Sequence, residues 1–383
     1  MKKILVIHTK YRNLGGEDIA VASEVRFLKK FYDVRTIYFS NTIINYPSQF
    51  LAFITNKNKR SINKIVEQLD DFNPDIVYIH NTWFKASLGI FKILENYDLK
   101  VLLKLHNLRY ECSKSIFQYK HFNDGNMCRA CGQTKKNYTI LNKYFDGNLL
   151  KSIILLRYGT KYIKILKNNN INILVLTKFH LQKLINLGVD SKKIHLFPNY
   201  IDSEKNILNY SENYIVYAGR ISKEKGVDEL VECFLKAKLS DTKLKIIGDG
   251  PDFTNLKKKY QQSNIEFYGQ INNNDVKNII KNSKGVVTAT KLYEGQPTLL
   301  CEAAMLGVPS IFPKSGGISD FFPTGYKFSF DFLDYEGLLS KLRLLEDEKT
   351  RLNQGMKSKV YIEKYLNEKD LMNRFEDIVN EKQ

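Results

Sequence analysis

The sequence predicts an α/β protein of two lobes, each containing a parallel sheet covered by helices on both faces. Short β-rich runs alternate with longer amphipathic segments along the chain, and two such series follow one another. The length of 383 residues also suits two domains of roughly 150 to 200 residues better than one core. Two lobes imply a cleft in which a ligand can bind.

Ten runs are predicted to be strands because they are short and rich in apolar and β-branched residues. The first series comprises 4–7, 34–39, 75–80, 101–106 and 173–177, and the second 214–219, 244–248, 265–269, 285–290 and 309–312. Helical patterns such as 17–31 and 225–237 lie between them.

A polar connector, residues 197–213, separates the two series and marks the domain boundary. We therefore expect a first lobe over residues 1–200 and a second over 201–363. The helical pattern at about 364–383 is a candidate to pack back on the first lobe.

Composition narrows the class of protein. With 43% hydrophobic and 12% aromatic residues the chain is expected to fold. The N-terminal MKKILVIHTKYR has only four consecutive apolar residues, and no run approaches the 18 needed to cross a membrane, so we expect a cytoplasmic protein. Five cysteines make a disulfide framework unlikely, and Cys233 and Cys301 are interpreted as packing residues.

The net charge of +18 is compatible with three kinds of partner: a nucleic acid, an anionic membrane or a phosphorylated substrate. The lysines are spread among acidic residues rather than clustered with aromatic ones, which disfavours nucleic acid.

Polar residues follow the predicted strands, where open α/β sheets bind their ligands. His8, His80 and His106 end strands of the first lobe and together favour a polar cleft, although each alone is more often structural. Gly15 and Gly16 precede a predicted helix, where they either hold a phosphate or only form a tight turn.

In the second lobe, Arg220 and Lys225 lie between the first strand and its helix. A fork-shaped guanidinium and a compact ammonium both suit a diphosphate, but the alternative is that they are simply solvated.

The stretch KLYEGQPTLLCEAAMLGVPSI predicts a loop and then a short helix, with Thr298 as its N-cap. The free N–H groups near Leu299 and Leu300 favour a phosphate. The carboxylates would then bind hydroxyls, Glu302 those of a ribose and Glu294 those of a sugar. The alternative is two surface glutamates.

Taken in order, these motifs resemble the fourth family of retaining glycosyltransferases, which has the glycosyltransferase-B fold. The segments that carry the resemblance are YRNLGGED, LKLHN, VLTKFHLQKLINLGVDSKKIHLFPNYID, GRISKEKG, LKIIGDGPDFTNL, IEFYGQI, EGQPTLLCEAAMLGVPSI and SGGISD. The resemblance implies two Rossmann-like lobes, with acceptor bound mainly to the first and a nucleotide sugar to the second.

The resemblance also assigns roles by position. The catalytic candidates are His106, Glu294, Arg220 and Lys225. The donor-binding candidates are Gly15, Gly16, Arg220, Lys225, Gly269, Glu294, Gln296, Pro297, Thr298, Leu299, Leu300 and Glu302. Gln296, Asp320 and Tyr200 depart from the family pattern, and the first two bear on sugar preference.

We expect catalysis without a metal, since Arg220, Lys225 and a helix N-terminus can neutralise the leaving diphosphate and the chain contains no Asp-x-Asp. Retention of anomeric configuration is implied by the resemblance alone. The expected acceptor is a saccharide, with a lipid-linked intermediate of a bacterial surface polymer as the working hypothesis.

Three alternatives stay open. Cys112, His121, Cys128 and Cys131 either hold a structural zinc or are ordinary residues of an acceptor loop. Residues 148–168 either lie on the inner face of an anionic membrane or form a core helix with a solvated basic face. A sugar-nucleotide epimerase would use a similar two-lobed scaffold.

Overall fold

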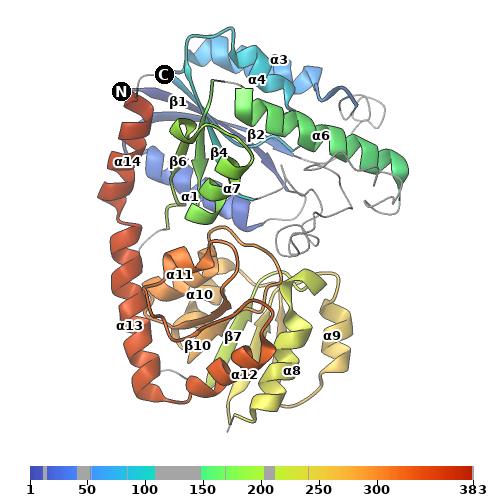
Figure 1. Ribbon diagram of the computed structural model, residues 1–383, viewed down its shortest axis with the longest axis vertical. Coiled ribbons are helices and arrows are strands. Elements are labelled where there is room, and N and C mark those ends of the chain that lie inside the picture. The colour runs from blue at the N-terminus through green and yellow to red at the C-terminus, as the bar shows by residue number, and fades with distance from the viewer. Residues whose placement is uncertain are drawn as a thin grey trace. The chain divides into compact units, whose positions relative to one another are not determined.

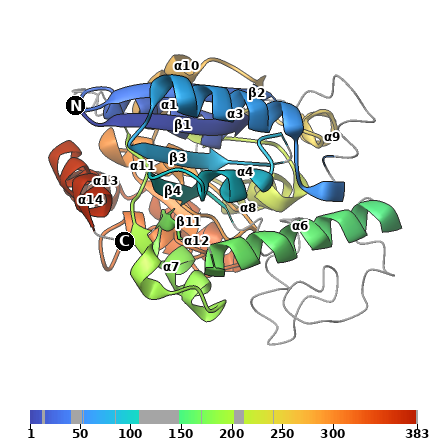
Figure 2. The same cartoon turned by 90° about the horizontal axis from the view of Figure 1, so that it is seen from above.

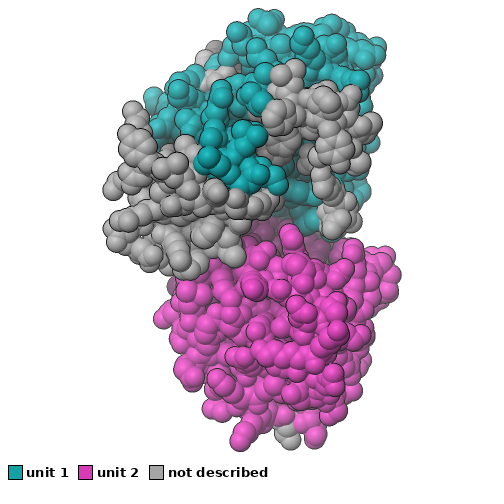
Figure 3. All heavy atoms as spheres, turned by 90° about the vertical axis from the view of Figure 1, so that its right-hand side faces the viewer, with its two compact units in different colours: residues 1–200, 368–383 teal, residues 201–367 magenta. Residues whose placement is uncertain are grey.

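The computed structural model describes residues 1–11, 15–40, 52, 54–83, 85–107, 148–168, 170–201, 212–239 and 241–381. The chain divides into two compact units, residues 1–200 with 368–383, and residues 201–367 (Figure 3). The division falls between Tyr200 and Ile201, where the sequence predicts the boundary.

Unit 1 contains a six-stranded parallel sheet in the order β2-β1-β3-β4-β5-β6. Its strands are β1 (Lys3–Lys10), β2 (Asp33–Ser40), β3 (Ile76–Asn81), β4 (Lys100–Leu105), β5 (Asn172–Val175) and β6 (Ile194–Leu196). Its helices are α1 (Gly16–Leu28), α3 (Lys59–Phe72), α4 (Gly89–Leu94), α6 (Leu149–Asn168), α7 (Lys178–Asn186) and α14 (Glu368–Asn380). Figure 1 shows α3, α4 and α6 on one face and α1 on the other, and β1, β3 and β4 can be followed in succession in Figure 2.

Unit 2 also contains a six-stranded parallel sheet, in the order β12-β11-β10-β7-β8-β9. Its strands are β7 (Tyr214–Ala218), β8 (Lys243–Ile247), β9 (Ile265–Gly269), β10 (Gly285–Val287), β11 (Ser310–Pro313) and β12 (Ser329–Phe330). Its helices are α8 (Val227–Ala237), α9 (Phe253–Lys259), α10 (Asn273–Lys281), α11 (Thr298–Met305), α12 (Tyr335–Leu344) and α13 (Glu348–Tyr365).

The predicted strands lie in these sheets, which confirms the α/β class with two parallel-sheet units. Strand β10 ends at Val287, so the predicted strand 285–290 is too long. Strands β6 and β12 were not predicted. Both are edge strands of three and two residues, too short to show a periodic pattern.

The strand orders determine where ligands can bind. In unit 2, β7 is the first strand and pairs with both β8 and β10, so the chain reverses direction across the sheet at that point. In unit 1 the corresponding reversal lies between β1 and β3. Ligands of open α/β sheets bind beyond the carboxyl ends of the strands at such reversals.

The C-terminal helix α14 completes the core of unit 1. The ring of Phe375 is fully buried and lies 5.5 Å from that of Phe197, 5.7 Å from Tyr32 and 5.8 Å from Tyr78, measured between centroids. Burial of a phenylalanine contributes about 1.5–3 kcal/mol, so α14 is an integral part of this unit.

A buried ion pair lies in the same core. Lys104 Nζ on β4 donates to Glu24 Oε2 on α1 at 2.6 Å, and neither residue is exposed to solvent. Tyr78 OH donates to the other carboxylate oxygen at 2.5 Å, and Lys104 also reaches the carbonyl of Pro198 at 3.4 Å. The network therefore ties β3, β4, α1 and the chain after β6 together.

Replacing Lys104 by Met should lower the stability of unit 1 by about 3–5 kcal/mol, because the Glu24 carboxylate would stay buried without a countercharge. Urea unfolding followed by tryptophan fluorescence measures this, since Trp83 in unit 1 is the only tryptophan. Lys30→Met is the matched control. It breaks an exposed pair of the same 2.6 Å length with Glu368 and should cost less than about 1 kcal/mol. If Lys104→Met and Lys30→Met lowered the free energy of unfolding equally, burial of the Lys104–Glu24 pair would not explain the loss.

A second prediction concerns acid stability. Burial lowers the pKa of His180 on α7 from 6.5 to about 4, so the folded protein holds this histidine neutral while the unfolded chain protonates it below pH 6.5. Stability is therefore lost as the pH falls from 6.5 toward 4, and this residue accounts for about 2 kcal/mol between pH 7 and pH 5. His180→Leu should reduce the loss between these two pH values by that amount, as measured by urea unfolding. If the free energy of unfolding of His180→Leu depended on pH as that of the wild-type protein does, this prediction would be wrong.

Candidate functional site

The sequence-predicted residues of unit 2 lie on the loops that leave β7 and β10, on either side of the chain reversal. Gly226 ends the loop after β7 with a φ of +66°. A Cβ atom there would lie 2.1 Å from the carbonyl oxygen of Ala289, so only glycine permits this approach. The two loops are thus in direct backbone contact.

This contact brings Lys225 and Glu294 together. Lys225 Nζ lies 2.6 Å from Glu294 Oε1, and the same oxygen accepts a hydrogen bond from Thr290 Oγ1 at 2.9 Å. Both charged side chains are about one-quarter exposed. The sequence assigned them to different parts of a ligand and did not predict their pairing.

The loop that carries Glu294 is also held from the side of β11. The carbonyl of Glu294 accepts from Gly317 N at 2.8 Å, and Ser315 Oγ donates to the carbonyl of Leu292 at 2.7 Å. A Cβ atom on Gly316 would lie 2.3 Å from the carbonyl oxygen of Glu294. The carboxylate therefore projects from a loop fixed at several backbone positions.

Helix α11 begins directly after this loop. Pro297 is its N-cap and Thr298 its first residue, so the prediction of Thr298 as the cap is wrong by one position. Pro297 has no side chain that can cap the helix, and the first helical hydrogen bond runs from Cys301 N to the carbonyl of Pro297 at 3.0 Å. The N–H groups of the first turn, including those of Leu299 and Leu300, therefore precede the intrahelical ladder and suit an anion.

The other predicted donor residues of unit 2 surround these elements. Arg220 is exposed, and its backbone carbonyl accepts from Tyr217 OH at 2.8 Å. Burial, and next the charge of Glu294, raise the pKa of Tyr217, which keeps this donor protonated. Gly269 ends β9 with a φ of +73°, and its carbonyl accepts from Gly248 N at 2.8 Å. Gln296 and Glu302 are half-buried, on the loop and in the first turns of α11.

Cys301 on α11 and Cys233 on α8 are both buried. Burial raises the pKa of Cys233 to about 11 and that of Cys301 well above its usual value, so both are protonated at neutral pH. These properties fit the predicted packing role.

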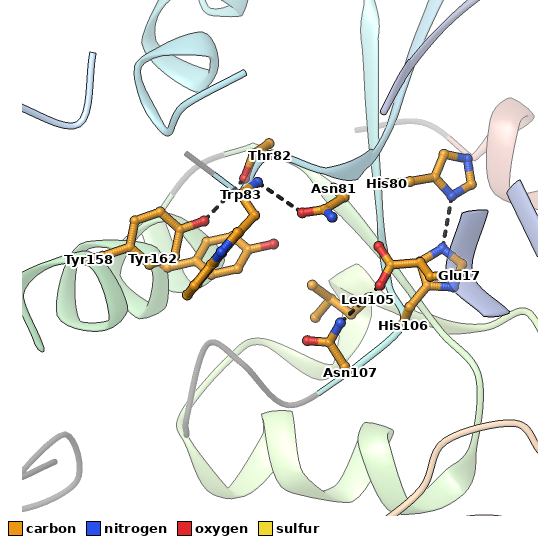
Figure 4. Close-up of a pocket in the computed structure, with 10 residues that line it drawn as sticks. All are labelled: Glu17, His80, Asn81, Thr82, Trp83, Leu105, His106, Asn107, Tyr158 and Tyr162. Atoms are coloured by element: carbon orange, nitrogen blue, oxygen red, sulfur yellow. Dashed lines mark hydrogen bonds between the residues drawn. The ribbon is translucent and has the colours of Figure 1, made fainter. Parts of the chain in front are cut away.

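In unit 1 a small pocket lies at the ends of β3 and β4 (Figure 4). Figure 4 shows three aromatic residues gathered at one end and Glu17 with His106 at the other. The residues lining it are Glu17, His80, Asn81, Thr82, Trp83, Leu105, His106, Asn107, Tyr158 and Tyr162.

Two histidines predicted from their strand ends meet in this pocket. His80 Nδ1 lies 2.9 Å from His106 Nε2, and the rings stack with centroids 5.3 Å apart. Burial lowers the pKa of both well below the usual value, and the Lys104 charge lowers each further, so both are neutral.

The tautomer of this pair follows from His80 Nε2, which is buried without a hydrogen-bond partner among the described residues. A buried N–H without an acceptor is rarer than a buried acceptor without a donor. We therefore assign the proton to His80 Nδ1, which donates to His106 Nε2. His106 then carries its own proton on Nδ1 and is a hydrogen-bond donor.

The third histidine, His8, has a different environment. Its Nε2 lies 2.8 Å from Asp18 Oδ1, and both side chains are buried. Burial lowers the pKa of His8 although Asp18 opposes this shift, so the histidine donates as a neutral ring.

Gly15 and Gly16 open α1, as predicted, but Gly15 N already donates to Asp18 Oδ2 at 2.9 Å. The φ of Gly15 is −118°, and an added Cβ would meet no atom closer than 3.7 Å. Neither a positive φ nor crowding therefore requires a glycine at position 15. Gly16 is exposed as the first helical residue.

Cys112, His121, Cys128 and Cys131 lie outside the described residues. Within the described ranges, no group of three or more His, Cys, Asp or Glu side chains is arranged to hold a metal ion.

The predicted membrane segment forms α6. Its buried side chains, among them Leu155, Tyr158 and Tyr162, pack in unit 1, as the core-helix alternative predicts. None of the helices in the described part of the chain is long and apolar enough to cross a membrane.

Sequence analysis missed several residues of these sites. Thr290 follows a strand and precedes Glu294 by four positions, but this position alone is weak evidence that a threonine belongs to the site. Trp83 follows His80 by three residues, so the strand-end argument could have included it. Tyr158 and Tyr162 come from a helix distant in sequence, and only the tertiary structure places them in the pocket.

Residues 200–364 match the family model described as glycosyl transferases group 1. Relatives include sulfoquinovosyl transferase SQD2 of Arabidopsis thaliana, 29% identical over 48% of this chain and 37% of that protein. Another is the putative teichuronic acid biosynthesis glycosyltransferase TuaC of Bacillus subtilis, 31% identical over 30% of this chain and 28% of that protein. These alignments span less than half the length of either relative.

Solved structures resemble the whole chain. HepE from Anabaena, in complex with UDP-glucose, has a TM-score of 0.68 with 13% identity over 99% of both chains. Sucrose-phosphate synthase from Thermosynechococcus elongatus has a TM-score of 0.71 with 15% identity over 99% of this chain and 98% of that one. These similarities establish the fold, which is the glycosyltransferase-B fold. Through residues 200–364, the chain is similar to the glycosyl transferases group 1 family.

Proposed function

We propose that the protein is a retaining, metal-independent glycosyltransferase that moves a sugar from a nucleoside-diphosphate sugar to a hydroxyl of a saccharide acceptor. The observation that carries this proposal is the Lys225–Glu294 pair at 2.6 Å, next in sequence to the uncapped N-terminus of α11. A cation, a carboxylate and free helical N–H groups at a strand reversal suit a ligand with both phosphates and hydroxyls.

The donor would bind to unit 2 with its diphosphate against Lys225, Arg220 and the first turn of α11. An ammonium group has three donors, so Lys225 can contact a phosphate while it still holds Glu294. As bond breaking places charge on the leaving diphosphate, these groups stabilise it without rearrangement. The UDP-glucose bound to HepE supports this class of donor.

The carboxylates would bind hydroxyl groups of the same donor. Glu294 Oε1 already accepts two hydrogen bonds, and none of the described residues is hydrogen-bonded to its Oε2. Oε2 is therefore available to the transferred sugar, while Glu302, one turn into α11, would bind the ribose.

The acceptor would bind to unit 1, near His106. A neutral histidine that donates through Nδ1 can hold a hydroxyl or phosphate oxygen, but it cannot remove a proton through that nitrogen. In a retaining reaction the departing phosphate oxygen would instead take the acceptor's proton. His106 would orient the reacting groups.

We propose a lipid-linked intermediate of a bacterial surface polysaccharide as the acceptor, supported by the names of relatives such as TuaC. The apolar side of α6 packs in unit 1, so a peripheral contact with an anionic membrane would use its basic residues. These are Lys151, Arg157, Lys161, Lys164 and Lys167.

Lys225→Ala and Glu294→Gln should each lower kcat/KM by about 100-fold or more, because each removes a group that contacts the donor in the transition state. Release of nucleoside diphosphate, measured with and without acceptor, reports the reaction and separates transfer from epimerisation. Lys243→Ala and Glu266→Gln are matched controls, since this pair in unit 2 has a 2.7 Å contact at the opposite end of the sheet. Wild-type turnover in either site variant would refute its role.

EDTA should leave the rate unchanged, because the positive charge that stabilises the diphosphate comes from the protein. The assay is the same release of nucleoside diphosphate, before and after chelation. If EDTA inhibited the reaction strongly and added manganese restored the rate, a metal ion would help to stabilise the diphosphate.

A further inference from the structure

Thr290 lies beside the Glu294 carboxylate, and its hydroxyl has a partner on each side. It comes shortly after β10, and its side chain is buried. Its Oγ1 accepts a hydrogen bond from the backbone N–H of Leu292 at 3.2 Å and lies 2.9 Å from Glu294 Oε1. A backbone N–H can only donate and a carboxylate oxygen accepts, so the hydroxyl proton points to Glu294. The direction of both hydrogen bonds is therefore determined.

The backbone around Thr290 is held on both sides. The carbonyl of Ala289 is so close to Gly226 that a Cβ atom there would lie 2.1 Å from the carbonyl oxygen. Lys291, the next residue, donates its backbone N–H to the carbonyl of Glu224 at 2.9 Å. The hydroxyl of Thr290 therefore projects from a segment that is anchored to the loop after β7.

Oε1 of Glu294 is held by two donors from different parts of the chain. Lys225 Nζ approaches it at 2.6 Å from the loop after β7, and Thr290 Oγ1 at 2.9 Å from the same loop as Glu294. One contact leaves a carboxylate able to turn about it, whereas two contacts from different directions fix its plane. Ordering a glutamate side chain costs conformational entropy, and here that entropy is lost on folding rather than on binding.

We propose that Thr290 is a positioning residue, whose hydroxyl holds Oε1 of Glu294 so that Oε2 accepts a hydrogen bond from the sugar of the donor. The inference rests on the proposed function, in which Glu294 binds that sugar. Lys225 does not replace this contact, because its ammonium group is shared with the diphosphate. Both hydrogen bonds of the Thr290 hydroxyl lie within residues 290–294, so they are independent of the phosphates.

Paired titrations measure what the sugar adds to binding. The full-length protein is titrated by calorimetry with UDP, GDP and ADP, and with UDP-glucose, UDP-galactose, UDP-N-acetylglucosamine, GDP-mannose and ADP-glucose. The dissociation constant of a nucleoside diphosphate divided by that of its nucleotide sugar is called the sugar ratio. Loss of a phosphate contact changes both constants, whereas a misdirected Glu294 changes only that of the nucleotide sugar. The sugar ratio of the tightest-binding nucleotide sugar therefore separates positioning of Glu294 from a general weakening of the donor site.

Thr290→Val should lower the sugar ratio by about tenfold, because a hydrogen bond to a charged group is lost and the carboxylate can turn. Thr290→Ala removes the same hydroxyl without putting a methyl group in its place and should give the same result. Thr290→Ser keeps the hydroxyl and should stay within about twofold of the wild-type ratio. The melting temperature of each variant shows that it is folded.

Thr242→Val is the matched control. Thr242 is also a buried threonine of unit 2, and its hydroxyl lies 3.0 Å from Asn213 Oδ1 and 3.2 Å from Glu346 Oε1. It directly precedes β8, so it lies at the opposite end of the sheet from Glu294. The same substitution there also separates a buried hydroxyl from a carboxylate, but it should leave the sugar ratio unchanged.

A double-variant cycle tests whether Thr290 acts through Glu294. Glu294→Ala should itself lower the sugar ratio by about tenfold or more, because the carboxylate that binds the sugar is removed. Adding Thr290→Val to this variant should change the ratio by less than about twofold, since the oxygen atom that Thr290 holds is already gone.

A wild-type sugar ratio in Thr290→Val and Thr290→Ala would overturn the inference, and so would an equal loss in Thr290→Ser. It would also fail if Thr290→Val had the same effect with and without Glu294, because Thr290 would then act by another route. If Glu294→Ala lowers the ratio and the Thr290 variants do not, the inference fails and the proposed function stands. If the wild-type protein binds none of the nucleotides or nucleotide sugars, both fail.

Discussion

The close approach of the loops after β7 and β10 is the constraint on which the candidate site of unit 2 depends. These strands pair in the sheet, yet Lys225 and Glu294 are 69 positions apart in the chain. Gly226 allows the loops to touch because any side chain there would overlap the carbonyl of Ala289. The ion pair is therefore positioned by backbone packing, and its geometry exists before any ligand arrives.

The described residues of the two candidate sites differ in chemical type. Unit 2 presents Lys225 and Arg220 close in sequence to the uncapped start of α11, which together attract phosphates. The described lining of the pocket in unit 1 includes the Glu17 carboxylate, the amides of Asn81 and Asn107 and two neutral histidines.

The Lys104–Glu24 pair connects the core of unit 1 to the chemistry of its pocket. Lys104 lies on the strand that ends beside His106, and its charge helps to lower the pKa of both His80 and His106. Tyr78, next but one to His80, donates to the same carboxylate. A buried charge network of this kind costs desolvation energy, but it ties the strands together. Burial lowers the pKa of both histidines most, and the Lys104 charge adds to that shift.

The sequence alone determined the two α/β units, their boundary near residue 200 and the positions of the long buried strands, because hydrophobic periodicity and strand-end polarity are local properties. It also indicated His80, His106, Lys225, Glu294 and α11, since each adjoins a recognisable strand or helix. The edge strands β6 and β12 were not predicted, because a run of two or three residues is too short to show a hydrophobic period.

Only the tertiary structure decided that Lys225 meets Glu294, that His80 meets His106 and that Tyr158 joins Trp83. Each of these contacts joins segments distant in the chain, and the order of strands in the sheet, which no local pattern encodes, determines which segments become neighbours.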